Sequence, residues 1–223
     1  MRVEWYGQSA FRLDDGDQTV AIDPFGDMSA ATAARGLRFD YPPITGLRAD
    51  LLLVTHEHAD HNGVDRVDGS PVVLRSTAGR LASPIGEVLA VASEHDTAAG
   101  TERGPNTMFA FEFGGVRIAH LGDLGQAALR DEQAAALGAV DLLFVPVGGG
   151  PTIGADVAAQ IAARLQARWI VPIHYRTART NFLEPADAFL ARFARVERLD
   201  GTSFELDALP GGEGALVVVP AAP

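Results

Sequence analysis

Three of the six histidines in the chain fall within residues 56–61, together with the carboxylate of Asp60; the run reads His-Glu-His-Ala-Asp-His. This cluster follows the apolar run Leu51-Leu52-Leu53-Val54 after a single threonine. Folding alone does not require such a cluster, and burying it without a bound partner is costly. Imidazole and carboxylate groups are ligands that zinc, manganese and iron accept. The sequence therefore predicts a chain that folds around a metal site next to an apolar strand.

The composition indicates a globular chain and narrows its partners. The chain has 223 residues, 47% of them hydrophobic, and a net charge of −11; it has no lysine, so all 18 basic residues are arginine. An acidic surface without lysine is poorly suited to following a phosphate backbone, which disfavours nucleic acid as a partner. The absence of cysteine excludes disulfides, cysteine-ligated zinc and a cysteine nucleophile.

The sequence carries no recognisable targeting or membrane signal. Residues 1–6 alternate like a strand and lack the apolar core of a signal peptide. No apolar run approaches the length of a transmembrane helix. We therefore expect a cytoplasmic protein that acts on a small-molecule substrate and does not bind a membrane. The oligomeric state stays open, with a homo-oligomer as one alternative.

Alternating hydrophobicity predicts a series of short strands, and helical periodicity predicts three helices. The pair Gly114-Gly115 between two alternating runs predicts a hairpin. Val157, Ile161 and Leu165 form the apolar stripe of an amphipathic helix. The expected strands are residues 2–6, 10–14, 18–22, 51–54, 71–74, 107–113, 116–121, 141–146, 168–173 and 215–219, and the expected helices are 126–137, 154–167 and 185–194.

The order of these elements favours the α+β class. Strands come first as a meander and later alternate with helices, which predicts two mixed β-sheets packed face to face with helices outside. No linker interrupts the chain, so we expect a single domain over residues 1–223, built from two similar halves of about 1–106 and 107–223. The segments 26–48, 93–106 and 148–153 are expected to be loops that decide the substrate.

Metal-capable side chains also follow other strand-like runs of the chain. These side chains are Asp23, His95, Asp123 and His174. Strand ends gathered at one edge of a sheet sandwich are a natural place to assemble a site from distant parts of a sequence. His120 differs because it lies within a predicted strand, three residues before Asp123, where a buried supporting role is favoured over ligation.

The sequence resembles the metallo-β-lactamase-fold superfamily of metal-dependent hydrolases over essentially the whole chain. The resemblance rests on the motif His-x-His-x-Asp-His and on the order of the strand-end residues. It is closer to the branch that contains the L-ascorbate phosphate lactonases, through Tyr6-Gly7-Gln8-Ser9, Ile22-Asp23-Pro24, His120-Leu121-Gly122-Asp123, Pro146-Val147-Gly148-Gly149 and Pro172-Ile173-His174-Tyr175. The resemblance implies an αββα four-layer sandwich.

The resemblance also implies two divalent metal ions, zinc first, with manganese or iron as alternatives. Residues two apart on an extended segment point the same way, which agrees with His56 and His58 serving one metal. Asp60 and His61 fall where the chain is expected to turn into a helix near Asn62, so they can address another position. By position, the ligands of the first metal are His56, His58 and His95, those of the second are Asp60, His61 and His174, and Asp123 bridges the two.

Such a site implies hydrolysis without a protein nucleophile. Two cations bridged by a carboxylate lower the pKa of a shared water toward neutrality and polarise the scissile oxygen. Asp60 is the expected catalytic residue, because it could steer that water or accept its proton. Some relatives have His where this chain has Gln8; an amide cannot act as acid or base, so any such role is lost or moved.

Other residues are expected to surround the metals. Asp23 and His120 would lie behind the ligands, where Asp23 would orient a ligating histidine or the turn of the motif. The candidate substrate contacts are Tyr175, Arg176 and Asn106. Arg176 could bind a phosphate or carboxylate through two hydrogen bonds, and a surface position explains it equally well.

The leading functional hypothesis is a metal-dependent hydrolase with a bridging hydroxide, acting on a small anionic substrate such as a phosphodiester, a lactone or a related ester. A metal-stabilised binding or sensing protein without turnover is the alternative, against which the intact Asp60 argues. A nuclease or a lipid phosphodiesterase is a further alternative, disfavoured by the acidic charge and by the lack of an amphipathic membrane helix. An oxygen-reducing diiron protein would need an electron source that the sequence does not suggest.

Overall fold

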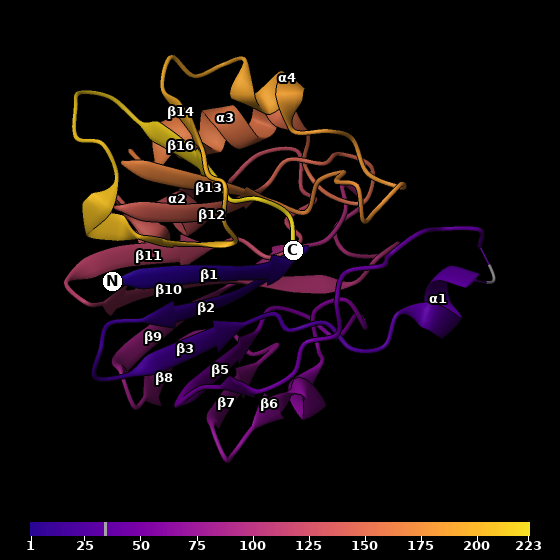
Figure 1. Cartoon of the computed structure of the whole chain (residues 1–223). Helices are drawn as coiled ribbons and strands as arrows, with labels where there is room; N and C mark the ends of the chain where they lie inside the picture. The colour runs from indigo at the N-terminus through magenta and orange to yellow at the C-terminus, as the bar shows by residue number, and fades with distance from the viewer. Residues whose placement is uncertain (34) are drawn as a thin grey trace.

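The computed structural model describes residues 1–33 and 35–223, which form two β-sheets packed face to face (Figure 1). The first sheet has the strand order β15 (Ser203–Glu205), β1 (Arg2–Gly7), β2 (Ala10–Asp14), β3 (Thr19–Ile22), β5 (Leu51–Val54) and β7 (Val72–Arg75). The second has the order β14 (Val196–Arg198), β16 (Leu216–Val219), β13 (Trp169–Ile173), β12 (Leu142–Pro146), β11 (Val116–His120), β10 (Pro105–Phe113), β9 (Gly86–Glu94) and β8 (Gly79–Ser83). A small ribbon pairs β4 (Leu47–Arg48) with β6 (Val67–Asp68).

Both sheets combine antiparallel and parallel strand pairs, as the sequence predicted. In the first sheet, β1, β2 and β3 form an antiparallel meander, to which β5 and then β7 add in parallel. In the second, β8 to β11 are antiparallel, and β12, β13 and β16 continue from β11 in parallel. The expected α+β sandwich of two mixed sheets is confirmed.

The facing sides of the two sheets share one hydrophobic core. Trp5, Phe11 and Leu53 reach it from the first sheet, and Phe109 and Phe144 reach it from the second. The rings of Phe11 and Phe144 meet across the interface with their centroids 4.6 Å apart. Because one core joins the sheets, burial of apolar surface stabilises both together rather than either one alone.

The outer faces of the two sheets are covered differently. On the second sheet, α2 (Asp131–Leu137) lies against β9 and α3 (Ala155–Arg164) against β12, with α4 (Asp187–Leu190) beside α3. On the first sheet, Leu52 and Val54 turn outward and pack with Phe25, Tyr41 and Ile44. An irregular segment therefore forms this outer layer, and α1 (Ser29–Ala33) stands away from the sheets (Figure 1).

The two halves predicted from the sequence do not coincide with the two sheets. β8 and β9, which the sequence pattern did not predict, form a hairpin on β10 and so place residues 79–94 in the second sheet. β15, from the far end of the chain, pairs with β1 in the first sheet. The hairpin has a weak hydrophobic signal because β8 is an edge strand that buries little of its surface.

The helices are shorter than predicted, for local reasons. Residues 126–130 do not join α2, because Nε2 of Gln126 donates hydrogen bonds to the carbonyl of Ala128 and to Oε1 of Gln133. Of the expected helix 185–194, only α4 forms, and α3 ends before residue 167. The expected helix near Asn62 is replaced by a turn and a short 3-10 helix at Val64–Arg66. None of the helices in residues 1–33 and 35–223 is long and apolar enough to cross a bilayer.

Candidate metal centre

Residues 55–61 form a tight turn at the end of β5 that carries the histidine cluster. The backbone N–H groups of His61 and Asn62 both donate to the carbonyl of His58. Nε2 of His56 lies 3.0 Å from Nδ1 of His58, so the two rings converge. His95, one residue beyond the end of β9, joins them, and one ligand-type atom from each of the three lies within 4.8 Å of the others. The strand end and the turn thus assemble a first group of three imidazoles.

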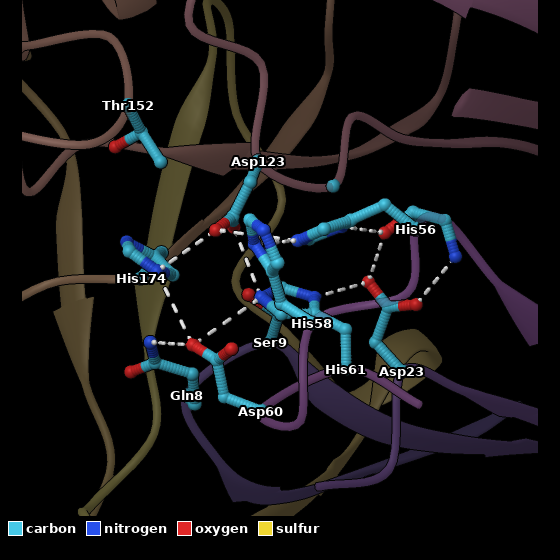
Figure 2. A network of polar contacts seen from close by, with 12 residues as sticks. Gln8, Ser9, Asp23, His56, His58, Asp60, His61, Asp123, Thr152 and His174 are labelled. Carbon is cyan, nitrogen blue, oxygen red and sulfur yellow. Dashed lines mark hydrogen bonds and ion pairs between the residues drawn. The ribbon is translucent and has the colours of Figure 1, made fainter. Parts of the chain in front are cut away.

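Asp60, His61, Asp123 and His174 form a second group, again with ligand-type atoms within 4.8 Å of one another. Asp123 lies between the groups (Figure 2). Its Oδ1 is 3.2 Å from Nε2 of His61, and its Oδ2 is 3.0 Å from Nε2 of His174 and 3.1 Å from Nε2 of His95. The structure therefore brings together all seven residues that the sequence singled out as metal ligands, from the ends of β5, β9, β11 and β13.

Asp23 lies behind the cluster and contacts His61 directly and His56 through Thr55. Its carboxylate accepts hydrogen bonds from Nδ1 of His61 at 2.8 Å, from the hydroxyl of Thr55 at 2.7 Å and from the N–H of Thr55 at 2.8 Å. The Thr55 hydroxyl in turn lies 3.1 Å from Nδ1 of His56. These bonds engage Nδ1 of both imidazoles and direct their Nε2 atoms toward Asp123, at 3.2 Å for His61 and 3.9 Å for His56, which is how carboxylates orient metal-ligating histidines. The structure thus places Asp23 next to a candidate ligand, and its supporting role stays a prediction.

His95 is oriented by a different partner. Its Nδ1 lies 2.9 Å from the carbonyl oxygen of Pro151, which can only accept a hydrogen bond, so Nδ1 carries the proton and Nε2 is free. A second loop, after β11, also approaches closely, because a Cβ on Gly125 would lie 2.4 Å from the carbonyl of His95. The tautomer and the backbone position of His95 are therefore both fixed by neighbouring loops.

His120 lies outside the cluster, in the core between the sheets. Its Nε2 donates to the carbonyl of Ser9 over 3.2 Å, and its Nδ1 accepts from the N–H of Gly122. Burial lowers the pKa of its imidazole, which keeps the ring neutral at pH 7. The residue joins the turn between β1 and β2 to the second sheet through these bonds.

Burial and mutual charge divide the histidines of the cluster into two kinds. Burial, reinforced by the neighbouring His61, lowers the pKa of His56 to about 3. Burial would also lower the pKa of His61 and His174, but the carboxylates of Asp123 and Asp60 outweigh it. The pKa of His174 rises to about 9, and that of His61 rises well above its ordinary value. Without a cation, protons on these two rings balance the two carboxylates.

The donor set fits divalent cations. Two buried atoms of the cluster, Nε2 of His61 and Oδ1 of Asp123, have no hydrogen-bond partner in residues 1–33 and 35–223, although they face each other. Buried polar atoms are rarely left so, and a bound cation would satisfy both. Imidazole nitrogen and carboxylate oxygen, without thiolate, suit zinc, manganese and iron alike.

Backbone strain and close packing hold the candidate ligand His174 in place. His174 has a φ of 50°, a left-handed conformation that residues other than glycine seldom adopt. A Cβ on Gly148 would lie only 2.1 Å from its carbonyl oxygen, so a glycine is required there. Gln8 and Asp23, with φ of 51° and 46°, share the same strain at the same site. Such strain persists only where surrounding structure determines it, as happens at functional sites.

A cavity of about 560 Å³ opens over the cluster. Asp60, Asp123 and His174 lie at its floor, and the predicted loops form its walls. The wall residues that bear on chemistry are the apolar Met28, Ala31, Leu37 and Phe182, the cationic Arg35 and Arg103, and the acidic Glu102. The cavity is therefore large enough for a small molecule and offers both apolar and charged contacts.

A family model described as the beta-lactamase superfamily domain matches residues 2–174. The chain belongs to this superfamily. A protein named UPF0173 metal-dependent hydrolase from Methylobacterium nodulans is 29% identical and covers 99% of this chain and 100% of its own length. A UPF0173 protein from Pyrococcus furiosus is 28% identical over 79% of this chain and 84% of its own. A crystal structure of a candidate zinc-dependent hydrolase of the metallo-β-lactamase superfamily from Thermotoga maritima superposes with a TM-score of 0.78, at 31% identity, over 98% of this chain and 97% of that one.

The substrate contacts that the sequence suggested for this superfamily member lie away from the cavity. Asn106 is buried, and its Nδ2 donates hydrogen bonds to the hydroxyl of Ser93 and the carbonyl of Leu121. Its Oδ1 accepts a hydrogen bond from the N–H of Asp123, so Asn106 positions Asp123 instead. The ring of Tyr175 stacks on Trp5 in the core. Nε of Arg176 donates to the carbonyl of Leu183. The sequence pattern could not distinguish these roles, because Tyr175 and Arg176 directly follow the candidate ligand His174, and the contacts of Asn106 are with residues distant in the chain.

Sequence reasoning missed several residues that shape the site of this superfamily fold. The hydroxyl of Thr55 links the carboxylate of Asp23 to Nδ1 of His56. The sequence signal for this role was the position of Thr55 directly before the motif. Gln8 was expected only to lack acid–base function, whereas its Nε2 donates to Oδ2 of Asp60 over 3.2 Å. Arg35 and Arg103 gave no signal, because nothing in their neighbouring sequence distinguishes them from surface arginines.

Proposed function

We propose that this protein is a dinuclear metal-dependent hydrolase that acts on a small anionic substrate, a phosphodiester, a lactone or a related ester. The proposal extends to this chain the metal-dependent hydrolysis named for its relatives. The observation that carries it is the position of Asp123: its Oδ2 lies 3.1 Å from Nε2 of His95 in the first group and 3.0 Å from Nε2 of His174 in the second, and its Oδ1 lies 3.2 Å from Nε2 of His61. A carboxylate in this position suits two cations that share it.

The residues divide into two sets that would hold one cation each. His56, His58 and His95 would hold the first. Asp60, His61 and His174 would hold the second, with Asp123 shared between them. When bound, the two cations would supply an activated water and would polarise the scissile oxygen, so no protein nucleophile is needed.

We propose that Asp60 accepts the proton of the nucleophilic water. Its pKa lies below the ordinary value although burial alone would raise it, because His61 and His174 surround the carboxylate. An ionised carboxylate at the floor of the cavity can orient a nucleophilic water and accept its proton. Gln8 would hold Asp60 in place through the amide hydrogen bond, without contributing a charge of its own.

The cavity supports a small substrate, and its cationic wall supports an anionic one. A volume of about 560 Å³ accommodates a metabolite-sized molecule. Arg35 and Arg103 add positive charge to a chain whose net charge is −11. Two bound divalent cations would reinforce this local positive field. The cytoplasmic location, the zinc preference and the possible homo-oligomer remain predictions from the sequence.

Metal analysis and a substrate panel test the proposal together. Protein purified without chelator, and protein reconstituted with zinc or manganese, is expected to hold two metal ions per chain by mass spectrometry of the elements. The loaded protein is expected to hydrolyse a member of a panel of phosphodiesters, lactones and thioesters. Absence of metal after reconstitution would contradict the proposal.

The variant Asp60→Ala separates an enzyme from a metal-stabilised binding protein. Loss of hydrolysis while metal remains bound would favour the enzyme, because Asp60 would then be needed for the reaction and not only for retention of the cation. A loaded wild-type protein that binds panel members but hydrolyses none would favour the binding protein.

A further inference from the structure

The cavity over the metal centre is lined by two arginines whose charge is unmatched. Arg35 and Arg103 both line it, and neither guanidinium group has a carboxylate within 4 Å among residues 1–33 and 35–223. Several arginines outside the cavity do form ion pairs; Arg75, for example, contacts Glu57. Glu102 lines the same cavity but makes no ion pair with either arginine. Two free guanidinium groups at one cavity of an acidic protein are available for a ligand.

Arg103 is presented by a loop that a buried carboxylate organises. The side chain of Asp96 accepts four backbone hydrogen bonds, from the N–H groups of Ala98, Gly100, Glu102 and Arg103, at 2.8 to 3.1 Å. Asp96 directly follows the candidate ligand His95 in the chain. The loop is therefore fixed to the metal centre at one end, and the guanidinium of Arg103 is offered from a preorganised backbone.

Arg35 reaches the cavity from a different segment of the chain, the one that carries α1. Its N–H donates to the carbonyl of Thr32, whose buried hydroxyl bonds the carbonyl of Met28. Met28 and Leu37 from the same segment line the cavity with apolar surface. The arginine thus stands beside a wall that suits a short carbon skeleton.

The cavity therefore has three chemically distinct parts. The floor has the candidate metal ligands, where a bond would be broken; the wall from residues 28–37 is largely apolar; and two free guanidinium groups project from separate loops. Guanidinium groups bind carboxylates and phosphates through paired hydrogen bonds. A substrate that used all three parts would have a reactive group, a short apolar stretch and a second, anionic end.

We propose that Arg35 and Arg103 recognise an anionic group of the substrate that is separate from the bond to be hydrolysed. The substrate class is then a compact ester or lactone that bears a carboxylate or a phosphate on a short carbon skeleton. The hydrolytic step rests on the proposed function, whereas the recognition of the second anionic group does not depend on turnover.

Calorimetry on the zinc-loaded protein tests this recognition directly. The three probes are pentanoate, glutarate and 4-phosphonobutyrate; each has a carboxylate that can reach the metals, and the last two carry a second anionic group at the far end. We expect at least one of the last two to bind about tenfold more tightly than pentanoate, as a charge-assisted hydrogen bond implies. The tighter of the two identifies the second group as a carboxylate or a phosphate.

The arginine variants give the decisive comparison. Arg103→Ala and the double variant Arg35→Ala/Arg103→Ala are expected to reduce or remove the preference over pentanoate while binding of pentanoate itself stays unchanged. Arg80→Ala, which removes an exposed arginine of β8 that does not line the cavity, is the matched control. Equal binding of all three probes to the wild type, or a preference that survives in the double variant, would overturn the proposal.

The variant Asp96→Asn tests the role of the loop. The amide retains an acceptor but loses the charge that four N–H groups favour, so we expect the probe preference to weaken while metal content stays at the wild-type level. Failure of hydrolysis on every panel substrate would contradict the proposed function, and an intact probe preference in the same protein would leave this recognition standing. An unchanged preference in Asp96→Asn would contradict the preorganising role of Asp96.

Discussion

Gln8 donates a hydrogen bond from its amide Nε2 to Oδ2 of Asp60 over a distance of 3.2 Å. The same oxygen lies 3.7 Å from Nε2 of His61 and 3.8 Å from Nε2 of His174. Gln8 is fully buried and holds a left-handed φ of 51°, so its side chain is directed at Asp60 by the backbone itself. A neutral amide here orients the carboxylate without competing for its proton.

Replacement of Gln8 by alanine is expected to lower kcat with little change in metal content. Asp60 would keep its charge but lose a charge-assisted hydrogen bond, for which about 1.5–3 kcal/mol is typical, so a decrease of about tenfold or more is expected. Steady-state kinetics on the best panel substrate, with metal analysis of the same sample, gives the answer. Gln18→Ala, on the surface, serves as control. A change confined to KM would argue against this role.

Asp23→Asn is expected to weaken metal binding by about 10- to 100-fold, the usual effect of removing a carboxylate that orients a metal-ligating histidine. Asparagine tolerates the left-handed conformation of residue 23, so the backbone is preserved. Competition with a chromophoric zinc chelator measures the affinity. Thr55→Val, which removes only the hydroxyl relay to His56, is expected to have a smaller effect. Equal affinity in Asp23→Asn and wild type would contradict the assignment.

Metal binding at pH 7 to 8 is expected to release protons. In the metal-free protein the carboxylates of Asp123 and Asp60 raise the pKa of His174 to about 9, so its ring is protonated in this range, and they shift the pKa of His61 in the same direction. A cation can bind an imidazole nitrogen only after its proton has left. Calorimetric titration with zinc in buffers of different ionisation enthalpy counts the released protons. A titration independent of the buffer would contradict the raised pKa values.

The stability of the metal-free protein should decrease between about pH 6.5 and pH 9. The pKa of His174 is raised from 6.5 to about 9 in the folded state, so its protonation favours folding below pH 6.5, and this contribution is lost as the pH rises through 9. Tm measured across this range on chelator-treated protein tests the sign. The zinc-loaded protein, in which protons no longer occupy these ligands, should show no such decrease.

Gly148→Ala is expected to destabilise the fold strongly, by about 3 kcal/mol or more, because its new Cβ would lie 2.1 Å from the carbonyl oxygen of His174. Chemical unfolding of the metal-free protein measures the loss without the contribution of the cation. Gly154→Ala is the matched control, since a Cβ there would meet nothing within 4 Å and the residue has an ordinary φ. Similar stability of the two variants would show that the approach at Gly148 relaxes easily.

Most of the candidate ligand residues were predictable from the sequence because they follow apolar runs, and the resemblance to a known superfamily grouped them. Strand β5 places the cluster 56–61, and β11 and β13 place Asp123 and His174. The apolar runs also predicted the two mixed sheets, since strand burial is read directly from hydrophobicity.

The loops around the cavity were predictable, but the side chains that line it were not. Arg35 and Arg103 line the cavity from loops whose paths depend on contacts distant in sequence or on single side chains, such as the bonds of Asp96 to the N–H groups that follow it. Asn106 was misassigned because its amide reaches Leu121 and Asp123, fifteen or more residues away in the chain. Hydrophobic periodicity contains no information on such contacts.

The irregular layer over the first sheet has a consequence for redesign of the protein. Phe25 and Tyr41 of this layer pack on the outward side chains of β5, whereas α1 and its neighbours between them face the cavity and stand clear of the sheets (Figure 1). The stretch from residue 27 to residue 38 is thus attached at both ends to packed aromatic residues. An engineer could exchange this stretch as a cassette to alter what the protein accepts, while the metal centre and the hydrophobic core keep their own supports.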